Sequence, residues 1–409
     1  MAESIPHLTL VPEVVVPRVT ERVQSIDVLR GTLMALMALG HTRHFLSDSL
    51  EFAPTNLQKT STALFLTRWI THFCAPGFVL LAGAGVYLLA SSKSRAEASR
   101  FLALRGLWLI FLELVVVRCL GWSFNFGFAY VMLGVLWAIG WSMLALAALI
   151  RLRVRSVVAF GVALIALHNA FDGVRSKVFG SFGWVWSVLH RTVQLEPIDG
   201  MRVKVGYPLI PWIGILAVGY GVGALLKQPR EVRKRILTRL GLGLIACFLL
   251  VRGINVYGDP RPWAVQSSFG FTIFSFLNCD KYPPSLAFVL MTFGPLLLAL
   301  AWLDRDLGPL ATPLAALGRV PLFYYLLHIP LIHAVAVVLA LLRYGHARFL
   351  FQDPPGAHGP PFPLPDDYGY SLPWVYVIWL GVVAVLVPLC IAFGQYKRAS
   401  RSVWLSYLL

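Results

Sequence analysis

The chain has 409 residues, of which 58% are hydrophobic and 13% charged, and its mean hydropathy is +0.72. Soluble domains carry about 25% charged residues, so this composition excludes a soluble enzyme and predicts an all-α, polytopic transmembrane helix bundle. The net charge of +16 is spread over separate short segments. It does not form a basic patch interleaved with aromatic residues, which argues against nucleic acid as a partner.

Ten apolar runs follow one another along the chain, and each is long enough to cross a hydrocarbon core of about 30 Å. Residues 1–20 are expected to form a cytosolic tail, and residues 21–409 a single transmembrane domain. Three longer connections, near residues 173–206, 257–284 and 344–370, are expected at the outer face. The runs lie near residues 25–47, 65–91, 100–120, 126–150, 155–172, 207–227, 234–256, 285–304, 311–343 and 371–395.

Basic residues recur at every second connection, and this alternation sets the expected orientation. Because short basic segments stay on the cytoplasmic side, both termini are predicted to be cytoplasmic. The outer connection 344–370 is rich in proline and glycine and is expected to form a cap or lid without regular structure. The basic groups are Arg18 and Arg22; Lys93, Arg95, Arg100 and Arg105; Arg151, Arg153 and Arg155; Lys227, Arg230, Arg233, Lys234 and Arg235; and Lys397, Arg398 and Arg401.

The first apolar run carries a polar stripe. At 100° per residue, Asp27, Arg30, His41 and His44 share one helix face with two methionines. Ionisable groups in a membrane span seldom face lipid, so we expect this face to look onto protein or a wet cavity. Two simpler interpretations stay open: Asp27 favours a helix N-terminus, and Arg30 is an anchor that reaches the headgroups.

The remaining intramembrane histidines fall in the outer half of the bilayer by the helical rise per residue. His72 lies on the second run, one turn from Arg68, and His328 lies on the ninth, after Arg319 and a proline at which that run is expected to kink or restart. Imidazoles transfer protons near neutral pH. The pattern predicts a tunnel with a cationic inner end, near Arg30, and a proton-handling outer end, at His41.

Other polar residues receive local interpretations. Lys281 is expected at the outer mouth, where it binds an acidic substrate group or reaches the interface as a lysine anchor. Glu113 is expected to pair with an arginine of another span. His168 is read as a packing or hydrogen-bonding histidine, and His333 as interfacial. The five cysteines include no Cys-x-x-Cys, so we expect neither a zinc ribbon nor a disulfide framework, and no metal.

Residues 22–31 (RVQSIDVLRG), with His41 fourteen positions after Asp27, resemble the first span of the membrane acyltransferase superfamily. This superfamily includes the acyltransferase type 3 proteins and the heparan-α-glucosaminide N-acetyltransferases. The similarity to ten-span bacterial relatives of the latter extends over about residues 18–409. The matching segments are residues 37–43 (MALGHTR), 68–76 (RWITHFCAP), 207–214 (YPLIPWIG), 258–260 (GDP), 281–285 (KYPPS) and 317–328 (LGRVPLFYYLLH).

The resemblance implies transfer of an acyl group, acetyl first among them, from cytosolic acyl-CoA to a hydroxyl or amine of a sugar or glycan acceptor at the outer face. By motif position it assigns catalysis to His41, with Asp27 in the motif and Arg30 as companion; His72 or Arg68 would stabilise the oxyanion. The chain has Gly40 where the bacterial relatives often have an aspartate.

The site residues expected are therefore of two kinds. The catalytic set is His41, His72 and Asp27, and the substrate-binding set is Arg30, Arg68, Lys281, His328 and Arg319. Short loops and the resemblance favour a multi-pass protein of a bacterial inner membrane, with lipids, acyl-CoA and a glycan as partners and room for a homodimer. Two other classes remain: a proton-coupled transporter or exporter that uses the histidines as a relay, and a non-catalytic membrane scaffold.

Overall fold

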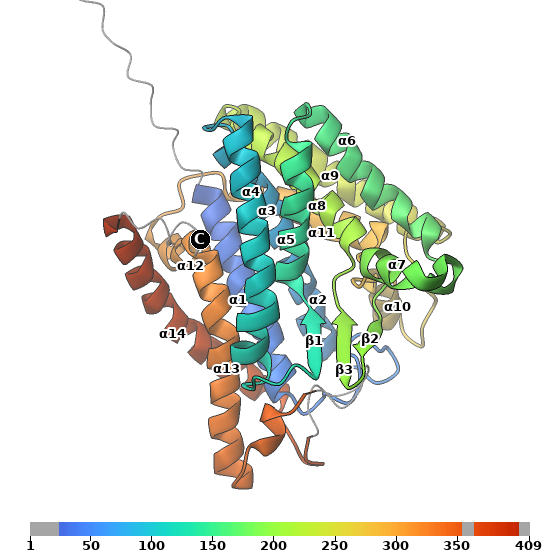
Figure 1. Ribbon diagram of the computed structural model, residues 1–409, viewed down its shortest axis with the longest axis vertical. Helices are drawn as coiled ribbons and strands as arrows, with labels where there is room; N and C mark the ends of the chain where they lie inside the picture. The colour runs from blue at the N-terminus through green and yellow to red at the C-terminus, as the bar shows by residue number, and fades with distance from the viewer. Residues whose placement is uncertain (1–23, 354–363, 401–409) are drawn as a thin grey trace, which may run out of the picture.

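The computed structural model describes residues 24–353 and 364–400, and the described chain is mostly helical (Figure 1). The expected tail at residues 1–20 lies outside the described residues, as do residues 354–363 of the proline-rich connection 344–370. The helices are α1 (Gln24–Leu46), α2 (Thr62–Ile70), α3 (Cys74–Ala90), α4 (Arg95–Phe111), α5 (Val135–Leu149), α6 (Val154–Leu167), α7 (Gly183–His190), α8 (Leu209–Leu226), α9 (Arg230–Ile254), α10 (Phe269–Leu277), α11 (Leu286–Leu303), α12 (Thr312–Arg319), α13 (Pro321–Tyr344) and α14 (Leu372–Ala399).

Seven helical segments within the described residues are long and apolar enough to cross a membrane. The prediction of a transmembrane helix bundle is therefore confirmed in its main part: the described chain is mostly helical and has several helices that could cross a membrane. The segments are Thr62–Ala90, which joins α2 and α3 through the 3₁₀ turn η1 (Thr71–Phe73), Val154–Phe171, which joins α6 to the 3₁₀ turn η3 (His168–Phe171), and α8, α9, α11, α13 and α14.

The other three predicted runs are also mainly helical, but they miss the length or polarity that marks a candidate span. α1 carries the polar stripe. α4 continues into a π-helical segment, η2 (Leu112–Trp122), which contains Glu113 and Arg118. α5 has 15 residues. The count of ten spans and the orientation of the termini stay predictions.

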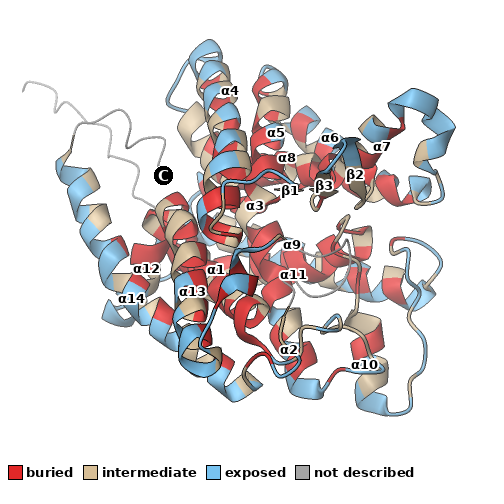
Figure 2. Ribbon diagram, turned by 60° about the horizontal axis from the view of Figure 1, so that its bottom comes forward, coloured by how far each residue is buried: buried red, intermediate tan, exposed pale blue. Residues whose placement is uncertain are grey.

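Burial divides the helices into an inner group and an outer group. α8 and α11 are each 67% buried within the bundle, whereas α9 and α14 are each only 22% buried. Figure 2 shows α14 as a largely exposed helix at the rim, whereas α1 and α11 are mostly buried. The outer helices expose apolar side chains, as expected of a surface that contacts the lipid tails of a bilayer. α1, by contrast, is enclosed, so its polar stripe faces protein, as the sequence predicts.

Close helix crossings use glycine. α1 crosses α12 where Gly31 lies against the Leu314 carbonyl and Gly318 against the Asp27 carbonyl, with no room for a Cβ atom at either glycine. α3 crosses α8 in the same way at Gly83 and Gly219. Small residues let membrane helices approach closely enough for dispersion contacts to hold them together.

A small sheet at the loop-bearing end was not predicted. Strand β1 (Tyr130–Leu133) pairs in parallel with β3 (Met201–Val205), which pairs antiparallel with β2 (Gln194–Ile198), and Figure 1 shows the sheet below α5 and α8. The prediction of continuous helix over residues 126–150 is therefore wrong at its start. The connection 173–206 also contains α7, and the connection 257–284 contains α10.

The predicted interruption near Arg319 is confirmed. α12 ends at Arg319, Val320 leaves the helical conformation at φ −128° and ψ 55°, and α13 starts at Pro321. Proline fits the first turn of a helix because its missing N–H would have no partner there. The break changes the direction and the rotational phase of the chain before His328.

Candidate functional site

Two histidines from distant parts of the chain form the centre of the site. His41, near the end of α1, and His328, in α13, are joined by a hydrogen bond of 2.8 Å between His41 Nδ1 and His328 Nε2. The rings lie face to face with their centroids 5.0 Å apart. The side chain of His328 is fully buried, and His41 retains partial exposure. The sequence placed both residues in the outer half but did not predict their contact.

The surrounding carbonyls fix the tautomers of this pair. His328 Nδ1 lies 2.7 Å from the Tyr325 carbonyl oxygen and 3.2 Å from that of Tyr324. Carbonyl oxygens only accept hydrogen bonds, so His328 Nδ1 carries the proton. In the neutral ring, Nε2 of His328 is then the acceptor, and His41 Nδ1 donates to it. His41 Nε2 consequently holds a lone pair, which is the form required of a base or a nucleophile.

Two cationic side chains, Arg68 and Lys281, lie near His41. The charges of Arg68 and Lys281 act on both His41 and His72. Lys281 is 7% exposed, and its ammonium lies 5.1 Å from the centroid of the Tyr282 ring. Burial lowers the pKa of Lys281, Arg68 adds to the decrease, and Tyr282 opposes it. Such an arrangement favours a substrate group with negative charge.

His72 lies in η1, which packs against α1 at Gly40. It is 3% exposed, its ring meets the Phe288 ring edge-on with 5.5 Å between centroids, and its Nδ1 has no hydrogen-bond partner among the residues that the structure describes. The structure thus brings His41 into contact with His328 and puts Arg68 and Lys281 close enough for their charges to act on both His41 and His72. Trp122, which meets His41 edge-on at 5.2 Å, was not predicted because nothing in its local sequence marks it.

A cavity of about 740 Å³ lies at the other end of the predicted tunnel, among α1, α3, α4, α5 and α13. The described residues that line it include no acidic side chain. The cavity suits a ligand with phosphate groups, because clustered ammonium and guanidinium groups form strong charge-assisted hydrogen bonds with them. Five cationic side chains line the cavity: Arg30, Lys93, Arg105, Arg319 and Lys397.

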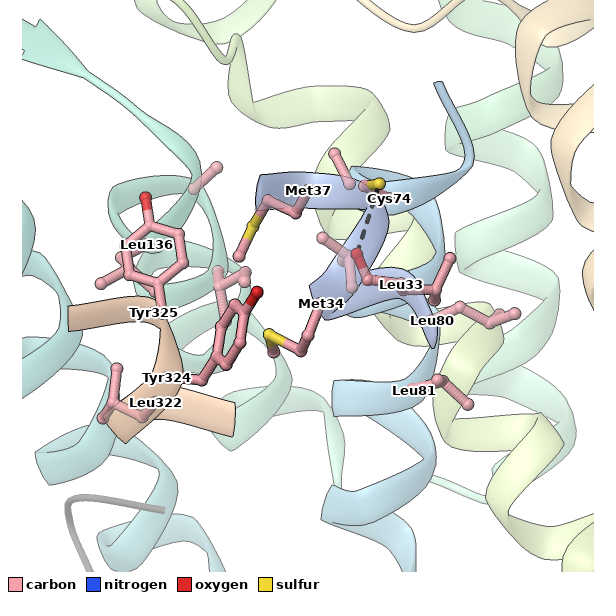
Figure 3. Packing of buried hydrophobic residues seen from close by; sticks show 14 of the residues in the cluster. Leu33, Met34, Met37, Cys74, Leu80, Leu81, Leu136, Leu322, Tyr324 and Tyr325 are labelled. Atoms are coloured by element: carbon pink, nitrogen blue, oxygen red, sulfur yellow. Dashed lines mark hydrogen bonds between the residues drawn. The ribbon is translucent and has the colours of Figure 1, made fainter. Parts of the chain in front are cut away.

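Methionine and tyrosine side chains lie between the cavity and the histidine pair. Figure 3 shows Met34 and Met37 of α1 pointing toward Tyr324 and Tyr325 of α13. Met34 and Tyr325 also line the cavity, and the Tyr325 carbonyl accepts the hydrogen bond from His328. Only about one helical turn therefore separates the cavity wall from the imidazoles, but His41 and His328 are not among the lining residues.

Asp27 and Arg319 lie together at the cavity end of α1. Arg319 Nε is 3.7 Å from Asp27 Oδ2, and Arg30 Nη1 donates to the Gly318 carbonyl at 3.2 Å. Fourteen residues of helix, about 21 Å at 1.5 Å per residue, separate Asp27 from His41. The structure therefore brings Asp27, Arg30 and Arg319 to one end and the histidines to the other.

One local prediction is wrong. Within the part of the chain that the structure describes, Glu113 does not pair with an arginine; its Oε2 accepts a hydrogen bond of 2.8 Å from the Leu136 N–H in the first turn of α5, where unpaired N–H groups and the helix dipole favour a carboxylate. His333 is fully buried inside the bundle, and its ring nitrogens lie 2.9 Å and 3.0 Å from the Gly121 and Leu350 carbonyl oxygens. Its depth in the membrane stays a prediction.

These features define a class: a polytopic transmembrane protein whose helix bundle encloses a polar site. The comparison with family models gives the particular family. Residues 22–254, more than half of the chain, match the family described as "Heparan-alpha-glucosaminide N-acetyltransferase, catalytic". The chain therefore belongs to this family of transmembrane acetyltransferases. A comparison with curated proteins gives no match. The match ends with α9, so His328 and Lys281 lie beyond it.

Proposed function

We propose that this protein transfers an acetyl group from cytosolic acetyl-CoA to an amine or hydroxyl of a sugar-containing acceptor at the outer face of the membrane. The family supplies the reaction class, since it implies acetyl-CoA as the donor and a sugar as the acceptor. The observation that carries the proposal is the His41–His328 hydrogen bond, because it leaves His41 Nε2 with a lone pair near the positive charges of Arg68 and Lys281.

The basic cavity is the proposed site for the CoA headgroup. Its phosphates would pair with Arg105, Lys93 and Lys397, while Arg30 and Arg319 are held at the same wall. From there the pantetheine arm extends along α1 toward His41. It passes between Met34 and Tyr325, and methionine suits such a position because its unbranched side chain changes conformation readily.

The proposed chemistry centres on His41. Nε2 takes the proton from the acceptor amine or hydroxyl as that group attacks the thioester carbonyl. Collapse of the tetrahedral intermediate breaks the C–S bond, and the CoA thiolate takes up the proton. In the second route, His41 Nε2 attacks the thioester, carries the acetyl group and passes it to the acceptor. In both routes His328 orients the ring, and Arg68 and His72 face the developing oxyanion.

We assign Asp27 a positioning role in this scheme. It lies at the crossing of α1 and α12, paired with Arg319. The pair orders the wall of the donor cavity and lies too far from His41 to share its proton transfer.

The proposal includes the membrane topology. Ten spans with both termini in the cytoplasm would put the basic connections and the donor cavity inside and the sheet outside. α1, α4 with η2, and α5 supply the three additional spans; α1 runs beside the candidate spans α13 and α14. A bacterial inner membrane fits this arrangement. Fusions of a reporter active only in the periplasm, placed after Tyr344 and after Arg153, test it: the first is expected to be active and the second inactive.

Reconstitution tests the activity. Purified protein in proteoliposomes receives acetyl-CoA labelled in the acetyl group on one side and glucosamine-terminated glycans on the other. We expect labelled acceptor only when both are present. Single turnover without acceptor separates the two routes, since acetyl-His41 releases CoA at once and a general base releases none. Substrate flux that depends on pH and proceeds without acetyl-CoA would instead establish a transporter.

A further inference from the structure

A cluster of potential metal ligands lies apart from the acetyl-transfer site, at the loop-bearing end of α6. His168 opens the 3₁₀ turn η3, Asp172 follows that turn, and His190 is the last residue of α7. One ligand atom from each of the three side chains lies within 4.8 Å of the other two. Two imidazoles and one carboxylate are a donor set typical of divalent transition metals.

The His168 ring is the observation that points to a ligand. It is 2% exposed, and the contact that it makes with the Pro284 carbonyl serves at most one of its two ring nitrogens, so at least one nitrogen has no hydrogen-bond partner among the described residues. Its ring centroid lies 5.5 Å from that of His190, so the ring faces the cluster. A buried ring nitrogen with no partner lacks compensation for its lost hydration. The Pro284 carbonyl lies beside the ring, and a backbone carbonyl is a common partner for the second N–H of a metal-binding histidine.

The other two side chains are already oriented by their neighbours. Asp172 Oδ2 accepts a hydrogen bond of 2.8 Å from Asn169 Nδ2, which leaves Oδ1 facing His190 Nε2 at 3.8 Å. The His190 ring lies flat on the Trp186 ring, with 4.8 Å between centroids, and Trp186 Nε1 donates to the Val174 carbonyl. Supporting contacts of this kind hold metal ligands in place and tune their affinity.

An ion pair between Asp172 and His190 does not account for the whole cluster. His190 Nε2 lies 2.8 Å from the His168 carbonyl oxygen and donates to it. This contact and the approach of Asp172 Oδ1 account for His190 Nε2 and for Asp172, but they leave at least one nitrogen of the His168 side chain without a partner among the described residues. A cation among the three side chains would occupy one of the two His168 ring nitrogens and leave the other for the Pro284 carbonyl.

We propose that His168, Asp172 and His190 bind one divalent transition-metal cation, Zn²⁺ in preference to others. Binding requires small side-chain rotations, because tetrahedral Zn²⁺ holds nitrogen ligands at about 2.0–2.1 Å. It also requires the tautomer of His190 that carries its proton on Nδ1. The side chain of Asp172 is 25% exposed, so a water molecule reaches the fourth position. This site is a departure from the sequence analysis, which expected no metal.

The position of the cluster assigns the cation a structural role. Asn169, next to His168, accepts a hydrogen bond of 2.9 Å from the Leu286 N–H at the start of α11. The cation would thus tie α6 and α7 to the segment from Lys281 to Leu286, which contains the lysine whose charge acts on His41. The inference does not depend on acetyl transfer, since the ligands and their neighbours stand on their own geometry.

The test uses the full, tag-free chain in detergent after treatment with EDTA. Zn²⁺ is titrated in competition with a chromophoric chelator, and Co²⁺ is added separately to report the ligand geometry by its visible absorption. We expect one Zn²⁺ per chain and a tetrahedral Co²⁺ spectrum. Asp172→Asn and His168→Gln should each weaken Zn²⁺ binding by at least about 100-fold, while His346→Gln, an exposed histidine beyond α13, should bind as the wild type does.

A second measurement, the unfolding temperature with and without Zn²⁺, distinguishes loss of the metal site from poor folding of a variant. Zn²⁺ should raise the unfolding temperature of the wild type and of His346→Gln, because a ligand that binds only the folded state stabilises it. It should not raise that of Asp172→Asn, whose changed side chain is partly exposed. Absence of stoichiometric Zn²⁺ in the wild type, or wild-type affinity in both Asp172→Asn and His168→Gln, would overturn the proposal.

Discussion

His41 Nδ1 donates a hydrogen bond of 2.8 Å to His328 Nε2, and the two residues are 287 positions apart in the chain. The hydrogen bond links α1 to α13, and it determines which nitrogen of His41 is free to react. The carbonyl oxygens of Tyr324 and Tyr325 accept from His328 Nδ1 and so keep the ring proton of His328 on that nitrogen. Backbone carbonyls thus orient the His328 ring, and His41 Nε2 is left for the substrate.

The first prediction concerns His41 itself. His41→Gln should lower kcat for acetyl transfer by about 100-fold or more, since the amide cannot serve as a base or carry the acetyl group. The KM for acetyl-CoA should change little, because the donor cavity is lined by other residues. Steady-state kinetics with labelled acetyl-CoA measure both constants. His346→Gln, a histidine outside the bundle core, serves as the control; equal activity in both variants would exclude His41 from the reaction.

The second prediction separates positioning from chemistry at His328. His328→Gln keeps a side chain that can accept the hydrogen bond from His41, whereas His328→Leu leaves His41 Nδ1 without a partner. We expect kcat to fall by roughly 10-fold in the first variant and by roughly 100-fold in the second, with the acceptor KM unchanged. A pH profile adds a specific readout, since only His328→Leu removes the group that stabilises the protonated His41 ring. Identical profiles in both variants would contradict the role given to His328.

The third prediction tests the donor cavity. Arg105→Gln and Lys93→Gln each remove one cationic side chain from its wall. Each should raise the KM for acetyl-CoA by about 10-fold to 100-fold, since a charge-assisted hydrogen bond contributes about 1.5–3 kcal/mol and about 1.4 kcal/mol is tenfold. The kcat should stay at the wild-type value. The effect should shrink when the donor lacks the 3′-phosphate. Arg155→Gln changes an exposed basic residue that does not line the cavity, and its KM should match the wild type. A rise of the same size in Arg155→Gln would point to general surface charge.

The fourth prediction is a pH dependence that arises at Lys281. Burial lowers the pKa of its ammonium below the ordinary 10.5, so the charge is lost at a lower pH than in an exposed lysine. The acceptor KM should therefore rise as the pH increases through this lowered pKa, because an anionic acceptor group then loses its partner. Lys281→Arg keeps its charge over this range and should abolish the rise. An acceptor KM that stays flat for the wild type up to the ordinary pKa would show that Lys281 does not bind the acceptor.

The sequence predicted the helices and the stripe on α1 better than it predicted contacts. Apolar runs are a local signal, and the stripe of Asp27, Arg30 and His41 follows from helical periodicity alone. The strand at Tyr130–Leu133 was missed because a short apolar run has no periodicity that separates strand from helix, and its partner β3 lies about 70 residues away.

The contact between His41 and His328 depends on tertiary structure, and this explains why it could not be predicted. An unbroken helix from Arg319 to His328 would place the Arg319 and His328 side chains on opposite faces of that helix. Because the helix breaks at Val320, the direction of the side chains on α13 does not follow from their direction on α12. The sequence therefore could not show which way His328 points. The assignment of Glu113 failed for a related reason. Its partner is the backbone N–H of Leu136 at the start of α5, and every residue except proline has such a donor, so the sequence does not mark the partner.

The last prediction concerns the crossing that orders the cavity wall. A methyl group at Gly318 would collide with the Asp27 carbonyl, and one at Gly31 with the Leu314 carbonyl. Backbone atoms cannot rotate away, so α1 and α12 must separate, and overpacking of this kind costs about 1–3 kcal/mol. Gly318→Ala should therefore lower the unfolding temperature in detergent and raise the KM for acetyl-CoA, because Asp27 and Arg319 move apart. Gly243→Ala, on an exposed face of α9 with open space around it, should unfold at the wild-type temperature or slightly above, since alanine favours helix by up to about 1 kcal/mol over glycine. If Gly318→Ala and Gly243→Ala behave alike in both measurements, the close approach of α1 and α12 does not order the donor site.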